Sequence, residues 1–268
     1  MPPPPIVLSI AGFDPSSGAG ITADIKTLAA HGCYGICCIT ALTVQSTTGV
    51  RRVEPVPANL VRETLDELAG DMAIAAVRIG MLGTLDVLDA VTDFLRMQHI
   101  AHVVLDPILK SSSGADLLEP AAVPTLVSTL FPRASVITPN IAEAAALTGL
   151  PVTNIEQMRS AAQRLHEMGA ANVVITGGHL ATPTDLLSMS VGAEPKVLEF
   201  AGQAIATRST HGTGCAFATS LAANLALGRP LPEAVLLAKQ YVARAMAAAY
   251  PVGHGAGPLN HMHMFGRE

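Results

Sequence analysis

The sequence predicts an α/β fold with a mostly parallel central sheet, helices on both faces of the sheet and an antiparallel hairpin at one edge. Short apolar runs, often β-branched and bounded by Gly, Pro, Asp or Asn, alternate with longer amphipathic stretches. This alternation is typical of buried parallel strands joined by helices. No linker, repeat or low-complexity tract divides the chain, so we expect a single domain over residues 1–268.

The elements follow one another in order along the chain. Buried strands are predicted at Ile6–Ala11, Ile36–Val44, Ala76–Met81, Val103–Ile108, Ser135–Thr138 and Val173–Thr176. Helices are predicted at Gly20–His31, Asn59–Met72, Thr84–Gln98, Glu119–Leu130, Ile141–Thr148 and Ile155–Met168. The hairpin is predicted from Leu186–Val191 and Val197–Ala201 around the turn Gly192-Ala193-Glu194-Pro195, and a short apolar run follows at Ala204–Thr207. Two long helices, Gly214 to Leu227 and Leu231 to Ala249, close the chain.

Composition excludes several classes of function. The net charge is −5, aromatic residues make up 3%, and no basic run exceeds Arg51-Arg52, so we expect no nucleic-acid binding. No apolar stretch approaches the roughly 18–20 residues of a membrane-spanning helix. The N-terminal Met1–Pro5 lacks the basic start of a signal peptide. We therefore expect a cytoplasmic protein with no membrane partner.

The cysteines and the C-terminal histidines do not form a convincing metal motif. Cys33, Cys37 and Cys38 lack a C-x-x-C spacing and are interpreted as small buried hydrophobic residues. The histidines of residues 254–263 have no further ligands beside them, so we expect no metal site in the tail.

The strongest chemical signal is the segment Thr210–Cys215, which directly precedes an apolar helix. Its glycines and the free amide groups of the helix N-terminus can form an anion-binding nest for a phosphoryl group. Cys215 then lies in the first helical turn, where the helix dipole is expected to lower the thiol pKa and favour a base. The alternative is a glycine-rich cap with a buried cysteine.

Polar residues at other predicted strand ends offer further site candidates, because ligands of open α/β sheets bind there. The loop from Gly12 to Gly20, with Asp24 one turn further on, could bind amines of a heterocycle, or it is a plain turn with a serine cap. Gln45 could hydrogen-bond a ring nitrogen or lie exposed in a loop, and His179 is equally ambiguous.

Asp106, Asn140 and Glu143 form a group of oxygen-bearing residues at two neighbouring strand ends. Carboxylates suit Mg²⁺, which usually keeps waters and bridges phosphates. Alternatively, Asp106 is a turn residue and Glu143 an acidic residue of the first helical turn.

Taken together, several segments resemble the hydroxymethylpyrimidine/phosphomethylpyrimidine kinases of thiamine biosynthesis, which belong to the ribokinase-like superfamily. These segments are Ser9–Thr27, Tyr34-Gly35 with Ile39–Thr47, Ile79–Gly83, Val104–Pro107, Thr138-Pro139-Asn140 with Glu143-Ala144, Gly177-Gly178-His179, Thr210–Cys215 and Gly253-His254-Gly255. The resemblance covers residues 6 to about 263. It implies a ribokinase-like three-layer α/β/α fold and two successive phosphorylations, of the alcohol and then of its monophosphate.

The resemblance also implies a role for each matching residue. Cys215 corresponds to the catalytic base, and Gly212, Thr213 and Gly214 to the anion hole. The pocket for the aminopyrimidine is matched by Gly12, Asp24, Gln45 and Met81. The residues that match the ATP and Mg²⁺ region are Asn140, Thr176 and His211 for the nucleotide, and Asp106 and Glu143 for the metal.

One departure from the family bears on ATP binding. Family members often carry lysine where this chain has Thr176, so a positive charge for the nucleotide phosphates is missing, and Lys110 is a candidate to replace it. A pyridoxal or pyridoxine kinase is an alternative on the same fold, and a non-catalytic pyrimidine-binding sensor is an alternative of another class. Because relatives commonly form dimers, we expect a homodimer.

Overall fold

The computed structural model describes residues 3–111, 114–178, 180–191 and 195–265. Its centre is one nine-stranded sheet with the strand order β3-β2-β1-β4-β5-β6-β7-β8-β9. The strands are β1 (Ile6–Phe13), β2 (Tyr34–Ser46), β3 (Gly49–Pro55), β4 (Ile74–Ile79), β5 (His102–Leu105), β6 (Val136–Ile137), β7 (Asn172–Ile175), β8 (Thr184–Met189) and β9 (Lys196–Ala201). Pairing is parallel from β2 through β1 to β7 and antiparallel at both edges. The predicted α/β fold is therefore confirmed.

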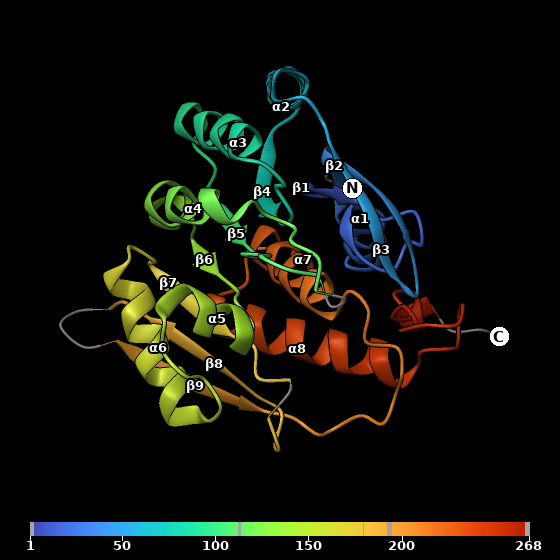
Figure 1. Ribbon diagram of the computed structural model, residues 1–268, viewed down its shortest axis with the longest axis vertical. Coiled ribbons are helices and arrows are strands. Elements are labelled where there is room, and N and C mark those ends of the chain that lie inside the picture. The colour runs from blue at the N-terminus through green and yellow to red at the C-terminus, as the bar shows by residue number, and fades with distance from the viewer. Residues whose placement is uncertain (1–2, 112–113, 179, 192–194, 266–268) are drawn as a thin grey trace.

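Helices cover both faces of the sheet (Figure 1). One face carries α1 (Gly20–Ala30), α7 (Thr213–Ala226) and α8 (Leu231–Ala247), and the other carries α2 (Ala58–Asp71), α3 (Leu85–Met97), α4 (Val123–Leu130), α5 (Ile141–Thr148) and α6 (Ile155–Glu167). Short 3₁₀ turns occur at Pro120–Ala122, Phe131–Arg133 and His263–Phe265.

Alternate residues of the central strands enter two separate cores, as the period of two along a strand requires. In β5, Val104 packs against the α7–α8 layer, whereas Val103 and Leu105 pack against the layer of α2–α6. Both faces are apolar, which explains why these strands are continuous apolar runs in the sequence.

The structure corrects four details of the sequence prediction. The sheet has an additional strand, β3, which pairs antiparallel with β2, and the run Ala204–Thr207 forms neither helix nor strand. β5 ends at Leu105, because Pro107 cannot donate a hydrogen bond to a neighbouring strand. The predicted helix Glu119–Leu130 is divided, since Pro124 lies in the first turn of α4 and marks a new helix start.

The predicted hairpin is present as β8 and β9, while Gly192, Ala193 and Glu194 of its turn lie outside the described residues. Within the part of the chain that the structure describes, none of the helices combines the length and apolar character needed to cross a bilayer.

Candidate active site

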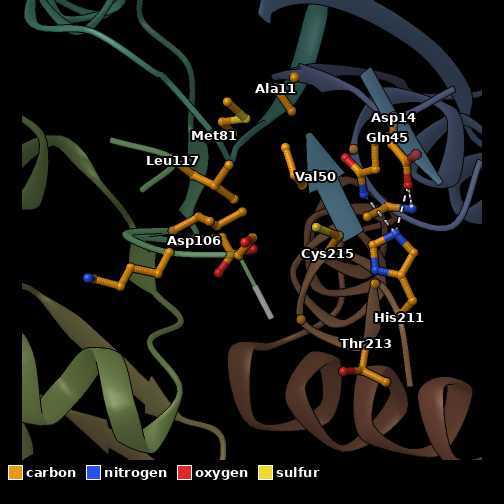
Figure 2. Close-up of a pocket in the computed structure, with 18 of the residues that line it drawn as sticks. Ala11, Asp14, Gln45, Val50, Met81, Asp106, Leu117, His211, Thr213 and Cys215 are labelled. Carbon is orange, nitrogen blue, oxygen red and sulfur yellow. Dashed lines mark hydrogen bonds and ion pairs between the residues drawn. The ribbon is translucent and has the colours of Figure 1, made fainter. Parts of the chain in front are cut away.

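A cavity of about 680 Å³ opens at the carboxyl ends of the central strands. Its wall is formed by the ends of β1, β2 and β4, the segment after β5, and the first turns of α5 and α7. Figure 2 shows Met81 and Asp106 on one side of the cavity and Gln45, His211 and Cys215 on the other. The position is the one expected for the ligand site of an open α/β sheet, and the volume suits a small molecule.

The glycine-rich segment before α7 forms part of this wall. Gly212 is the N-cap of α7 and has a left-handed conformation with φ +81°, which glycine adopts without steric cost. Gly212, Thr213 and Gly214 all line the cavity. Because the first amide groups of a helix have no partner within the helix, this segment can present N–H donors to an anion.

His211 joins three segments at the edge of the cavity. Its Nε2 lies 2.8 Å from Oδ2 of Asp14 and 3.2 Å from Nε2 of Gln45. Burial acts to raise the pKa of Asp14, but hydrogen bonds from His211 and Ser16 outweigh it and hold the pKa below its usual range. The structure thus brings His211 to the side of Gln45, the residue expected to meet the pyrimidine.

Gly12 and Met81 form an apolar part of the wall. A Cβ atom at Gly12 would lie 2.8 Å from Sδ of Met81, so glycine at this position leaves room for the methionine. Together with Gln45, both residues line the same cavity.

Cys215 is a half-buried free thiol on the cavity wall. Burial raises the pKa of the Cys215 thiol to about 11, although Arg78 acts in the opposite direction. The expectation that the helix N-terminus lowers this pKa is therefore wrong, because the loss of hydration is the larger effect. At neutral pH the group is predominantly the protonated thiol.

Asp24 does not reach the cavity, contrary to the expectation that it meets the substrate. Its side chain is fully buried, and its Oδ2 atom lies 3.1 Å from Nη1 of Arg78. Ser9 donates a hydrogen bond of 2.6 Å to the same oxygen, and Thr219 donates one of 2.7 Å to the other. Asp24 is thus a buried counterion of Arg78, which itself lines the cavity.

Asp106 and Glu143 both line the cavity and affect one another electrostatically. Burial raises the pKa of Asp106 to about 6 and that of Glu143 to about 8, and the charge of Asp106 contributes to the second shift. Arg78 binds Oδ2 of Asp106 at 2.8 Å. Two neighbouring carboxylates that resist ionisation are suited to a divalent cation, which would neutralise them. Among the described residues no group of three or more His, Cys, Asp or Glu side chains surrounds a metal position.

Asn140 and Thr176 lie beside one another but differ in their relation to the cavity. Asn140 lines it and caps α5 in a capping box with Glu143. Thr176 forms a short bridge with Asn140 but does not belong to the cavity wall. Lys110 does belong to it, and its Nζ pairs with Oδ1 of Asp116 at 3.2 Å. His179 lies outside the described residues.

Two residues of the site, Asp14 and Arg78, were given no role by the sequence analysis. Arg78 interrupts an otherwise apolar buried strand, and a lone cation in such a strand is the signal that could have found it. Asp14 follows β1 directly and lies in a segment rich in small residues, which is a signal shared with ordinary turns.

Residues 14–260 match the family model described as phosphomethylpyrimidine kinase. The hydroxymethylpyrimidine/phosphomethylpyrimidine kinase of Haemophilus influenzae is 41% identical over 262 residues, which cover 95% of this chain and 96% of that protein. The thiamine biosynthesis bifunctional protein ThiED of Geobacter sulfurreducens is 42% identical over 256 residues, 96% of this chain but 52% of that protein.

Solved structures of two kinds of kinase match the fold of the chain. An ADP complex of Bacillus subtilis pyridoxal kinase matches with a TM-score of 0.88 and 30% identity, over 98% of this chain and 99% of that one. The phosphomethylpyrimidine kinase of Clostridium difficile matches with a TM-score of 0.78 and 34% identity, over 90% of this chain and 99% of that one. These likenesses confirm the expected ribokinase-like fold.

Proposed function

The chain belongs to the phosphomethylpyrimidine kinase family, and from this premise we propose that it uses ATP to phosphorylate 4-amino-5-hydroxymethyl-2-methylpyrimidine and then its monophosphate for thiamine biosynthesis. The observation that carries the proposal is the composition of the cavity. An anion nest at Gly212–Gly214 and the pair Gln45 and Met81 line the same space, so a phosphoryl group and a small heterocycle can be bound side by side.

In the first step, the substrate hydroxyl oxygen forms a bond to the γ-phosphorus of ATP. The bond from that phosphorus to the oxygen shared with the β-phosphate breaks, and ADP leaves with this oxygen. In the fraction of the enzyme in which Cys215 has already lost its proton to solvent, the hydroxyl proton passes to the thiolate Sγ. A thiol pKa of about 11 means that little thiolate is present at pH 7, but the thiolate that forms is a strong base. The amide groups of residues 212–214 stabilise the charge on the transferred phosphoryl group.

In the second step, a phosphate oxygen of the monophosphate is the nucleophile. The second ionisation of a phosphate monoester occurs near pH 6, so this nucleophile carries its charge without help from a base. Cys215 therefore has less to contribute in the second step than in the first.

Asp106 and Glu143 are the residues that would hold Mg²⁺. When bound there, the ion would neutralise charge on the phosphate oxygens of ATP. Asn140 and His211 both line the cavity, and we propose them as contacts of the nucleotide phosphates. Thr176 forms a bridge with Asn140 but does not line the cavity, and its side chain carries no charge. Lys110 lines the cavity and supplies a positive charge there.

The function is tested by ADP release with the hydroxymethylpyrimidine and its monophosphate as separate substrates. Turnover with both supports the proposal. Binding of either compound without release of ADP would identify a sensor, and neither binding nor turnover would refute the assignment to pyrimidine substrates.

Pyridoxal is a second candidate substrate, because structures of pyridoxal kinases from Bacillus subtilis and Staphylococcus aureus match the chain with TM-scores of 0.88 and 0.86. Including pyridoxal and pyridoxine in the same assay ranks the substrates by kcat/KM. We expect the pyrimidine to have the higher value, since Gln45 and Met81 match the pyrimidine pocket.

We further propose that residues 1–268 form one kinase domain, that the protein forms a homodimer and that it is cytoplasmic. The single sheet supports the first point. Exposed apolar side chains on β2, Leu42 and Val44, support a partner surface, which light scattering of the purified protein tests. Four cysteines in the free thiol state suit a reducing compartment.

A further inference from the structure

A fully buried guanidinium lies beneath the cavity. Arg78 is the penultimate residue of β4, and its neighbours Val77 and Ile79 enter the core on the α2–α6 side of the sheet. Arg78 therefore points to the opposite face, towards α1 and α7, where its side chain has no solvent exposure. Removing a cation from water is costly, and apolar replacements of buried ion pairs are often neutral or stabilising. Fold stability thus gives no reason for a charge here.

The guanidinium pairs with carboxylates from two different parts of the fold. Nη2 donates to Oδ2 of Asp106 at 2.8 Å, just beyond the end of β5. Nη1 donates to Oδ2 of Asp24 in α1 at 3.1 Å. Burial raises the pKa of the Cys215 thiol in the first turn of α7, and the charge of this guanidinium acts against that shift. A planar guanidinium can hold such partners at fixed spacing, which a point charge cannot do equally well.

The position of this guanidinium is fixed from several sides. Asp24 is itself held by hydrogen bonds from Ser9 and Thr219, so it forms a rigid anchor. Gly80 leaves the space that the guanidinium occupies, because a Cβ atom at this position would overlap Nη1. Among the described residues Nε of Arg78 has no hydrogen-bond partner, so the two carboxylates determine where the group lies.

We propose that Arg78 is a positioning residue of the kinase, which fixes the carboxylate of Asp106 for phosphoryl transfer while Asp24 anchors it from below without contacting the substrate. This inference rests on the proposed function. It deepens that function, because it names a side chain of β4, the strand between β1 and β5, as a group that positions a reacting residue.

Four variants test the proposal. Replacing Arg78 alone with an apolar residue leaves Asp24 buried and unpaired and endangers folding. The first variant is therefore the double variant Arg78→Met with Asp24→Asn, which leaves no buried carboxylate at Asp24 without its cation. Gly80→Ala keeps every charge and displaces the guanidinium. Arg78→Lys keeps the charge without the planar group, and Arg96→Met, which breaks only an exposed ion pair with Asp93, is the control.

Each variant is measured by thermal unfolding, by calorimetric binding of the hydroxymethylpyrimidine, and by kcat for ADP release. We expect the double variant to fold, to bind the pyrimidine within about threefold of wild type and to lose about 100-fold in kcat, as misplaced reacting groups do. Gly80→Ala should lose about tenfold in kcat with unchanged binding, and Arg78→Lys should retain at least about a tenth of wild-type kcat. Arg96→Met should match wild type.

A folded double variant with wild-type kcat would overturn the proposal. So would an equal loss of pyrimidine affinity and of kcat, because it would mean that Asp24 or Arg78 acts by binding substrate. Wild-type turnover is judged separately: a wild-type protein that releases no ADP with the pyrimidine refutes the proposed function itself.

Discussion

Replacing Gly212 with alanine is expected to impair both folding and phosphoryl transfer. Gly212 has φ +81°, and a residue with a Cβ atom costs about 1–2 kcal/mol in this left-handed conformation. In addition, the new Cβ atom would overlap the carbonyl oxygen of Gly18, far inside ordinary van der Waals contact of roughly 3.5 Å. The two segments must therefore move apart by more than about 1 Å, which displaces the nest from the loop against which it packs.

Gly228 offers a matched control at the other end of α7. Its φ is +80°, and a Cβ atom there would meet nothing within 4 Å. The loss of stability in Gly228→Ala thus comes from the left-handed backbone conformation alone, without a steric overlap. For a domain of this size about 1 kcal/mol corresponds to a decrease in Tm of roughly 2–4 °C. We expect about that decrease, or up to twice as much, for Gly228→Ala and a larger one for Gly212→Ala.

The assay combines thermal unfolding with steady-state ADP release. Gly212→Ala should lose about 100-fold in kcat, because a displacement of about 1 Å costs this much in a positioned reaction. Gly228→Ala should retain wild-type kcat. A Gly212→Ala protein with wild-type kcat, whatever its Tm, would refute the conclusion that this segment positions the transferred phosphoryl group.

Three further predictions concern the base, the nucleotide and the C-terminal segment. Cys215→Ala should keep pyrimidine binding but lose about 10²–10⁴ in kcat for the first step and less for the second; near-full activity in the first step would contradict the base assignment. Thr176→Lys should lower the KM for ATP, and an unchanged KM would exclude a missing charge at this position. Burial, with the charges of Lys26 and His263, lowers the pKa of His261 to about 4. In the unfolded chain the His261 imidazole takes up a proton near pH 6.5, whereas in the folded chain it stays neutral down to about pH 4. The free energy of unfolding should therefore fall by up to about 3 kcal/mol between pH 6.5 and 4. The free energy of unfolding of His261→Asn, measured with urea between pH 6.5 and 4, should depend less steeply on pH than that of wild type. An unchanged pH dependence would exclude His261 as the source of the loss of stability.

The strands of the central sheet were predictable from the sequence because both of their faces are buried. A run such as Val103–Leu105 is apolar throughout and leaves no other interpretation in a chain of alternating elements. β3 was missed for the opposite reason. Its residues Arg51, Arg52 and Glu54 are exposed, and pairing with β2 alone, without a second core, stabilises it as a strand.

The candidate site was predictable at strand ends and helix starts, where local sequence determines local geometry. Gln45, Met81 and Cys215 reach one cavity for this reason. Asp24 was assigned wrongly because its position one turn into α1 gives no information about which side of the helix faces the sheet core. The thiol pKa of Cys215 was assigned in the wrong direction because burial depends on residues from α1, β4 and β5, which no local pattern reveals.

The shape of the site depends on glycines paired with large side chains from elsewhere in the chain. Gly12 leaves room for Met81, and Gly18 for His211, since a Cβ atom at either glycine would come too close to these side chains. Directly after β4, Gly80 does the same for Arg78. Interiors are packed at crystal-like density, so enlarging the small member of such a pair displaces the large one. The large members are residues expected to bind, orient or position the reacting groups. A glycine of this kind therefore acts on chemistry without contacting substrate, and alanine there should lower kcat more than its effect on stability alone would require.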